Sequence, residues 1–439
     1  MTSTRFAPSG PLRGSLRPPS DKSISHRAAL IAAMGEGETT IEGYLDAADT
    51  RSTLEAVKAL GAEVSEEKLG KGEGTAGARG LHLLIHGTGL RSPKPAHIDV
   101  GNAGTLLRLL PGWLAGQDGG RWILDGDESI RRRPVDRIAI PLREMGADLS
   151  SREDRLPPLE VRGAPLRGIT YEMPIASAQV KSCLLFAGLL AGGDTRVVEP
   201  HPSRDHTEQM LAAAGVSVTS EGNVVAISPA ERLEPDDLLV PADISSAAFF
   251  LTAAVLVPGS EVELDWVGIN PTRTGLLTIL ERMGVEFEFD EEAESGGERV
   301  ATIRARHASL QRTEVGGPEI PLAIDELPLV ALAACFAEGT TVIRDAEELR
   351  RKESDRIETV TTALRALGGH VEATEDGMVI EGTGGLRGGP IDSHGDHRIA
   401  MLGAVAGLAS REGVEVRGME AAAVSYPGFE ADLASLTRS

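Results

Sequence analysis

One pattern recurs six times along the chain: an apolar stretch, a glycine turn, a short β-like run and then a helical pattern. The β-like runs start 66 to 83 residues apart, as GETTIEG at Gly37, GRWILDG at Gly120, GDTRVVEP at Gly193, GSEVELDW at Gly259, GTTVIRDA at Gly339 and GVEVRGM at Gly413. Self-similarity at such a period indicates one supersecondary unit used repeatedly. The sequence therefore predicts a pseudo-symmetric α/β fold.

The segment before each β-like run is apolar on nearly every side, which is typical of a helix buried on all faces. These segments read SISHRAALIAAMG, AGTLLRLLPGWLAG, AQVKSCLLFAGLLAGG, ISSAAFFLTAAVLVPG, ELPLVALAACFAEG and HRIAMLGAVAGLAS. We expect three units to pack their apolar helices inside and their sheets outside, which gives two similar lobes. The repeat count places the boundary between the lobes near residues 240–245.

Composition and charge exclude several classes of function. The chain has 439 residues and a formal net charge of −22, so a surface that binds nucleic acid or anionic membranes is not expected. Its Phe, Trp and Tyr residues number 8, 3 and 3, too few for base-stacking platforms. No apolar run reaches the length of about 18 residues that a membrane span needs, and the N-terminus lacks an apolar signal region. We expect a soluble cytoplasmic protein.

Cations gather at a few places, next to the polar residues that open the apolar helices. Ser, Asp and Asn at these positions are ordinary helix caps, but capping does not require Lys22, Gln179, His397 or Arg398. Further cations follow the β-like runs, in RRRP, SRDH and RRKESDR. Such runs are usually solvated, yet pseudo-symmetry directs these toward one shared cleft. Helix N-termini and arginine forks suit phosphates and carboxylates, so we expect an anionic metabolite.

Two carboxylates lie among these cations and are candidates for general acid–base chemistry. Asp325 precedes the fifth apolar helix, and Glu353 lies within RRKESDR. His and Cys residues show no spacing typical of a zinc site, and no Ser-His-Asp order with a nucleophile elbow is found. The sequence predicts no metal.

Seven motifs, in order, resemble those of the 5-enolpyruvylshikimate-3-phosphate synthase (3-phosphoshikimate 1-carboxyvinyltransferase) family. They are PSDKSISHRA, GNAGTLLR, GDESIRRRPVDRI, SAQVKS, SRDHTE, RKESDRI and GDHRIAM, and the resemblance covers essentially the whole chain. It implies a two-lobed inside-out α/β barrel of six βαβαββ-type repeats, with buried helices inside and sheets outside. Residues 21–240 would form lobe two, residues 1–20 and 241–439 lobe one, and the hinge would lie near 20 and 240.

The resemblance also implies a reaction of the shikimate pathway, which supplies aromatic amino acids. The enolpyruvyl group of phosphoenolpyruvate moves to the 5-hydroxyl of shikimate 3-phosphate, with release of phosphate, through a tetrahedral intermediate and without a cofactor. Asp325 is implied as the base for the attacking hydroxyl. Glu353 is implied as the proton donor to the methylene carbon, with Lys22 assisting.

Binding residues follow from the same resemblance. Those implied for shikimate 3-phosphate are Lys22, Ser23, Arg27, Ser177, Gln179, Ser203, Arg204, Asp325 and Lys352. Those implied for phosphoenolpyruvate are Lys22, Gly104, Arg133, Gln179, Arg356 and Arg398. The expected partners are these two small molecules, without nucleic acid or membrane, and the expected state is a monomer.

Three alternative functions compete with this interpretation. An enolpyruvyl transferase acting on UDP-N-acetylglucosamine is disfavoured because Lys22 is followed by Ser23, not asparagine, and because GDESIRRRP contains no cysteine. A relative that processes RNA ends is opposed by the acidic charge and the few aromatic residues. A non-catalytic metabolite-binding relative is disfavoured by the combination of Lys22, Asp325, Glu353 and Arg398. The lysine that many relatives carry before the C-terminal aromatic-Pro pair is absent from AVSYP, which keeps this last alternative open.

Overall fold

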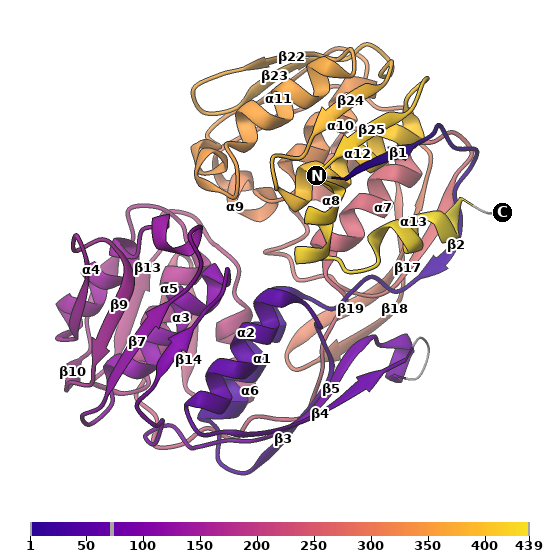
Figure 1. Cartoon of the computed structure of the whole chain (residues 1–439). Helices are drawn as coiled ribbons and strands as arrows, with labels where there is room; N and C mark the ends of the chain where they lie inside the picture. The colour runs from indigo at the N-terminus through magenta and orange to yellow at the C-terminus, as the bar shows by residue number, and fades with distance from the viewer. Residues whose placement is uncertain (1, 71–73, 438–439) are drawn as a thin grey trace. The chain divides into compact units, whose positions relative to one another are not determined.

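The computed structural model describes residues 2–70 and 74–437, and these form two compact units (Figure 1). Unit 1 contains the chain up to Pro19, Ala242–Ala293 and the chain from Arg299 onward, and unit 2 contains Ser20–Pro241 and Glu294–Glu298. The chain thus passes between the units twice near the predicted hinge positions. The short segment 294–298, which the repeat places in lobe one, packs with unit 2.

The six apolar segments form helices that are buried along almost their whole length. They are α1 (Lys22–Met34), α3 (Gly104–Ala115) and α5 (Ala178–Gly188) in unit 2, and α7 (Ile244–Leu256), α10 (Leu327–Phe336) and α12 (His397–Ala409) in unit 1. All 13 residues of α7 are buried. Helices apolar on every side are stable only when other elements surround them, and each group of three lies in the hydrophobic core of its own unit.

The six predicted β-like runs form strands, each followed in the chain by a more amphipathic helix or turn. The strands are β3 (Glu38–Tyr44), β7 (Arg121–Asp125), β13 (Thr195–Val198), β17 (Glu261–Gly268), β21 (Thr340–Ile343) and β25 (Val414–Arg417). The helices that follow the first five are α2 (Ala48–Ala59), α4 (Asp136–Met145), α6 (His206–Ala213), α8 (Gly275–Arg282) and α11 (Arg356–Ala366). The last element is α13 (Phe429–Leu436).

One sheet topology is used five times among the described residues. In each case a strand pairs in parallel with a short edge strand on one side and antiparallel with a hairpin on the other, in the orders β16-β3-β5-β4, β6-β7-β9-β8, β11-β13-β15-β14, β2-β17-β19-β18 and β20-β21-β23-β22. In unit 2 the other strands of these sheets are β4 (Glu63–Leu69), β5 (Gly80–His86), β6 (His97–Asp99), β8 (Asp148–Arg152), β9 (Leu156–Arg162), β11 (Thr170–Glu172), β14 (Val218–Glu221), β15 (Val224–Ile227) and β16 (Leu238–Leu239), and β10 (Leu166–Arg167) pairs separately with β12 (Ala191–Gly192). In unit 1 they are β2 (Arg13–Leu16), β18 (Phe287–Ser295), β19 (Glu298–Arg306), β20 (Glu314–Val315), β22 (His370–Ala373) and β23 (Met378–Glu381), although the end of β18 and the first residue of β19 fall in the segment 294–298 of unit 2.

The sheet of the sixth repeat is completed by the other end of the chain. Strand β25 pairs in parallel with β24 (Gly389–Asp392) and antiparallel with β1 (Ser3–Phe6), which joins Ser3 to Arg417 in register. Within the described part of the chain this repeat has no hairpin of its own, so β25 would otherwise expose an unpaired edge. The N-terminal strand covers that edge.

No helix among the described residues is long and apolar enough to cross a membrane.

Candidate active site

Three helix N-termini meet in unit 1, because the buried helices α7, α10 and α12 pack against one another. The residues that precede these helices are Asp243, Glu326 and Asp396, all acidic. Asp243 and Asp396 accept hydrogen bonds from backbone N–H groups of their own helices, as ordinary N-caps do. Capping residues in the local sequence therefore determine where these helices begin, and packing of the helices brings their N-termini together.

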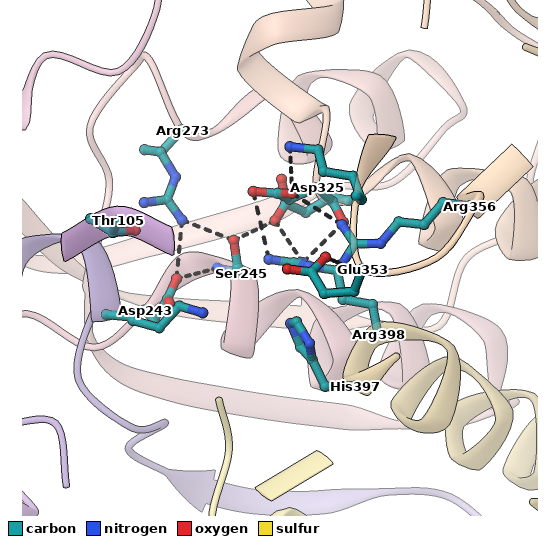
Figure 2. A network of polar contacts seen from close by, with 12 residues as sticks. Thr105, Asp243, Ser245, Arg273, Asp325, Glu353, Arg356, His397 and Arg398 are labelled. Atoms are coloured by element: carbon teal, nitrogen blue, oxygen red, sulfur yellow. Dashed lines mark hydrogen bonds and ion pairs between the residues drawn. The ribbon is translucent and has the colours of Figure 1, made fainter. Parts of the chain in front are cut away.

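Asp325, the residue before Glu326, lies among the cations Lys352, Arg356 and Arg398, and Figure 2 labels the two arginines. Its Oδ1 lies 3.2 Å from Arg356 Nη1 and 3.5 Å from Lys352 Nζ, and its Oδ2 lies 3.8 Å from Arg398 Nη2. The carboxylate proposed as a base therefore lies among positive charges. All four residues were predicted from the sequence, and the structure places them in one network.

Arg356, the first residue of α11, is 1% exposed and is held by three carboxylates. Its guanidinium donates to Asp396 at 2.9 Å, to Asp325 at 3.2 Å and to Glu353 at 2.6 Å. Burial disfavours the charged guanidinium, but Glu353, Asp396 and Asp325 outweigh burial and hold its pKa above the ordinary value. The pKa of Asp396 is correspondingly low, because the charge of Arg356 and its hydrogen bond outweigh the opposing effect of burial. Arg356 thus fixes the two candidate acid–base groups, Asp325 and Glu353, on one rigid guanidinium.

The network continues from Arg398 to residues that the sequence analysis did not select. Arg398 Nη1 donates to the backbone carbonyl of Asp325 at 2.9 Å and to Glu326 Oε1 at 3.3 Å. Ser245 Oγ donates to the same Glu326 oxygen and accepts from Arg273 Nη2 at 2.8 Å. Figure 2 shows this chain of contacts from Arg398 to Arg273. The repeat could have identified Arg273, because NPTRTG follows the fourth β-like run at the position where RRRP and RRKESDR follow theirs.

In unit 2 the start of α3 is surrounded by arginine side chains. A methyl group added at Gly104 would lie 2.9 Å from Arg133 Nη1 and 3.0 Å from Arg108 Nη1. Arg133 is held by hydrogen bonds from Nη2 to Asn102 Oδ1 at 2.8 Å and to Ser129 Oγ at 3.3 Å. A helix N-terminus without a side chain and with two guanidinium groups beside it favours anions.

The neighbouring helix α5 brings Gln179 to the same helix start. Gln179 Nε2 donates to Thr105 Oγ1 at 3.2 Å, and Thr105 follows Gly104 in α3. Ser177 is the N-cap of α5 and accepts from Val180 N at 3.4 Å. The predicted residues Gly104, Arg133 and Gln179 therefore form one cluster at the N-termini of α3 and α5.

The first turns of α1 carry Lys22, Ser23 and Arg27. Lys22 pairs with Asp49 at 3.2 Å and keeps a quarter of its side chain exposed. Arg27 is 3% exposed and donates to Thr207 Oγ1 at 2.7 Å and to Ser182 Oγ at 2.9 Å. Burial lowers the pKa of Arg27 to about 10, so the group stays cationic at neutral pH.

A buried cluster of charged side chains holds Ser203 by hydrogen bonds. The sequence did not predict this cluster. Lys181 is 1% exposed and lies 2.8 Å from Glu199 and 2.7 Å from Glu208. Lys181 Nζ also donates to the backbone carbonyl of Ser203 at 3.2 Å, and Ser203 Oγ donates to Glu199. Burial raises the pKa of Glu208 despite the nearby Lys181. Arg204, next in the chain, is half-buried.

Among residues 2–70 and 74–437, no group of three or more His, Cys, Asp or Glu side chains has an arrangement that could hold a metal ion. Cys183 and Cys335 are free and buried, and burial raises the pKa of the Cys335 thiol to about 12. Both cysteines pack as small apolar groups.

Comparisons with known proteins identify one family. The sequence profile of the EPSP synthase family (3-phosphoshikimate 1-carboxyvinyltransferase) matches residues 6–433. The chain is 50% identical over 438 residues to the 3-phosphoshikimate 1-carboxyvinyltransferase of Thermus thermophilus, with 99% of each chain covered. It is 47% identical over 428 residues to the enzyme of the same name from Bacillus cereus, with 97% of each chain covered.

Solved structures give the same result. The EPSP synthase structure from Acinetobacter baumannii superposes with a TM-score of 0.86 at 40% sequence identity, and the match covers 99% of this chain and 98% of that one. The family model and the relatives identify a transferase, and the candidate site of this chain gathers cations around carboxylates. The chain belongs to the EPSP synthase family of 3-phosphoshikimate 1-carboxyvinyltransferases.

Proposed function

We propose that this enzyme transfers the enolpyruvyl group of phosphoenolpyruvate to the 5-hydroxyl of shikimate 3-phosphate and releases inorganic phosphate. The observation that carries the proposal is the Asp325 carboxylate with Lys352, Arg356 and Arg398 around it and Glu353 on the same guanidinium. One cluster therefore supplies a base, an acid and cations for anionic ligands.

In the addition step, Asp325 accepts the proton of the 5-hydroxyl as its oxygen bonds to C2 of phosphoenolpyruvate. Glu353 delivers a proton to the methylene carbon C3, with Lys22 assisting, which produces a tetrahedral intermediate. In the elimination step, the bond between C2 and the phosphate oxygen breaks and the proton held by Asp325 passes to the leaving phosphate. C3 returns a proton to the Glu353 carboxylate, which restores the double bond. The cations stabilise the charge on the leaving phosphate.

We assign one set of residues to each substrate, and Lys22 and Gln179 belong to both sets. For phosphoenolpyruvate they fall to Lys22, Gly104, Arg133, Gln179, Arg356 and Arg398. For shikimate 3-phosphate they fall to Lys22, Ser23, Arg27, Ser177, Gln179, Ser203, Arg204, Asp325 and Lys352. Support comes from the anion-favouring start of α3 beside Arg133 and from the buried cationic Arg27 at the start of α1. The two-lobed inside-out barrel, the hinge near residues 20 and 240, the monomeric state and the cytoplasmic location belong to the same proposal.

Phosphate release tests the proposal. Purified enzyme is given phosphoenolpyruvate together with either shikimate 3-phosphate or UDP-N-acetylglucosamine, and inorganic phosphate is measured. We expect phosphate release when shikimate 3-phosphate is the second substrate and none when UDP-N-acetylglucosamine is. This result would also show that the reaction does not need a lysine within AVSYP. Folded protein that binds shikimate 3-phosphate but releases no phosphate is a non-catalytic relative, and the proposal is then wrong.

A further inference from the structure

The side chain of Glu326 is almost completely buried and does not serve the helix that it precedes. The residue is 1% exposed at the start of α10, yet its carboxylate makes no capping hydrogen bond to that helix. Its Oε2 atom has no hydrogen-bond partner among the described residues. A buried carboxylate with an unsatisfied oxygen is unfavourable for folding, and an apolar side chain would avoid that cost. Helix capping and stability therefore do not explain a glutamate here.

The other carboxylate oxygen, Oε1, contacts Arg398 directly and is linked to Arg273 through Ser245. It accepts from Arg398 Nη1 at 3.3 Å and from Ser245 Oγ. Ser245 Oγ in turn accepts from Arg273 Nη2 at 2.8 Å, and Arg273 is itself 3% exposed. Arg273 thus polarises the serine hydroxyl that donates to Glu326. Arg273, Ser245 and Glu326 are all buried, and hydrogen bonds away from solvent are strong.

Only one end of the Arg398 guanidinium is used by these contacts. Nη1 donates to Glu326 and to the Asp325 carbonyl, whereas Nε and Nη2 donate no hydrogen bond among the described residues. Nη2 lies 3.8 Å from Asp325 Oδ2, beside the candidate base. An arginine held by one nitrogen offers its remaining Nε–Nη2 edge for bidentate binding of a planar carboxylate.

We infer that Glu326 is a positioning residue, which holds Arg398 so that its Nε–Nη2 edge receives the carboxylate of phosphoenolpyruvate. Ser245 and Arg273 keep Glu326 in place. The inference rests on the proposed function, in which Arg398 binds phosphoenolpyruvate.

The test is a Glu326→Gln variant, which keeps the side-chain size and an acceptor oxygen but removes the charge. The charge-assisted hydrogen bond to Arg398 is lost, so we expect KM for phosphoenolpyruvate to rise roughly tenfold or more. KM for shikimate 3-phosphate should change less than about twofold and kcat less than about threefold, as for loss of uniform binding. Glu347→Gln is the matched control, because Glu347 is exposed in the same unit, and it should leave all three constants unchanged.

A double-mutant cycle with Arg398→Lys separates positioning from general structural support. Arg398→Lys alone should raise KM for phosphoenolpyruvate, and adding Glu326→Gln should raise it no further, because both changes remove one interaction. Additive effects, an equal rise in both KM values, or an unchanged KM in Glu326→Gln would overturn the role of Glu326 and leave the proposed function intact. No phosphate release by the parent enzyme, or an unchanged KM in Arg398→Lys, would overturn the reaction or the role of Arg398.

Ser245→Ala provides a second measurement if Glu326→Gln does not fold, as judged by circular dichroism. This variant removes the hydroxyl that donates to Glu326, and we expect KM for phosphoenolpyruvate to rise about two- to fivefold. A folded Ser245→Ala enzyme with unchanged KM would contradict the inference.

Discussion

Two glycines of helix α3 have opposite surroundings, and alanine at each should therefore have opposite effects. At Gly104 the added methyl group would meet only the guanidinium tips of Arg133 and Arg108, at 2.9 and 3.0 Å. At Gly112 it would lie 2.0 Å from the backbone carbonyl oxygen of Cys183, in the closely packed pair α3 and α5. A flexible side-chain tip can retreat, whereas a buried helix backbone cannot.

Gly104→Ala should impair binding and leave folding almost unchanged. The Arg133 guanidinium must retreat by about 0.5 Å to reach ordinary contact distance, which disturbs its hydrogen bonds to Asn102 and Ser129. Loss of one charge-assisted hydrogen bond to phosphoenolpyruvate corresponds to about 1.5–3 kcal/mol, or roughly a tenfold or larger rise in KM. Alanine is a better helix former than glycine, so we expect the free energy of unfolding to change by less than about 1 kcal/mol.

Gly112→Ala should destabilise the enzyme without a selective effect on either substrate. The backbones of α3 and α5 must separate by about 1 Å, and overpacking of this kind costs typically 1–3 kcal/mol or more. The helix preference for alanine offsets at most about 1 kcal/mol of this cost.

Steady-state kinetics with each substrate varied in turn, together with urea denaturation of both variants, checks the pair. If Gly104→Ala keeps the parent KM for phosphoenolpyruvate, Arg133 does not bind that substrate at the start of α3. If it unfolds as readily as Gly112→Ala, the assignment of Gly104 to an open, side-chain-lined position is wrong.

Three further predictions concern proton transfer, phosphate binding and acid stability. Glu353→Gln should lower kcat by roughly 10²–10⁴-fold with both KM values within about threefold, and a kcat within a factor of about two of the parent would remove Glu353 as the proton donor. Arg27→Ala should weaken binding of shikimate 3-phosphate by roughly tenfold or more, measured by calorimetry on protein with an unchanged circular dichroism spectrum, and unchanged affinity would reject that contact. Burial, with Lys22 and Arg27 nearby, lowers the pKa of His26 from 6.5 to about 3, so below pH 6.5 the unfolded chain binds a proton that the folded chain does not. Stability should therefore fall by about 2 kcal/mol between pH 6.5 and 5 on account of this group, and urea denaturation should show a smaller fall in His26→Gln; an identical pH dependence would contradict the shift.

The local pattern of the sequence was sufficient to predict the repeated elements. The six apolar segments and the six β-like runs correspond to helices and strands of the structure, because burial on all faces and glycine turns leave a clear periodic signal. The resemblance to the family, based on seven ordered motifs, identified Asp325, Lys352, Glu353, Arg356 and Arg398, which the structure joins in one network.

Contacts between distant parts of the chain could not be predicted in this way. Nothing in residues 3–6 indicates pairing with residues 414–417, since the partner of an edge strand depends on which edge the rest of the fold leaves open. Nor does sequence spacing show that Arg356 is buried among three carboxylates, because their positions depend on how helices α10, α11 and α12 pack.

The sequence by itself determined the apolar helices, the β-like runs and the family, and it selected candidate residues for the chemistry, because these follow from side-chain type and local order. Only the tertiary structure decided which charges face each other: Lys181 with Glu199 and Glu208, and Glu326 between Ser245 and Arg398. The energies of these buried groups depend on distance and desolvation, and both are properties of the packed fold.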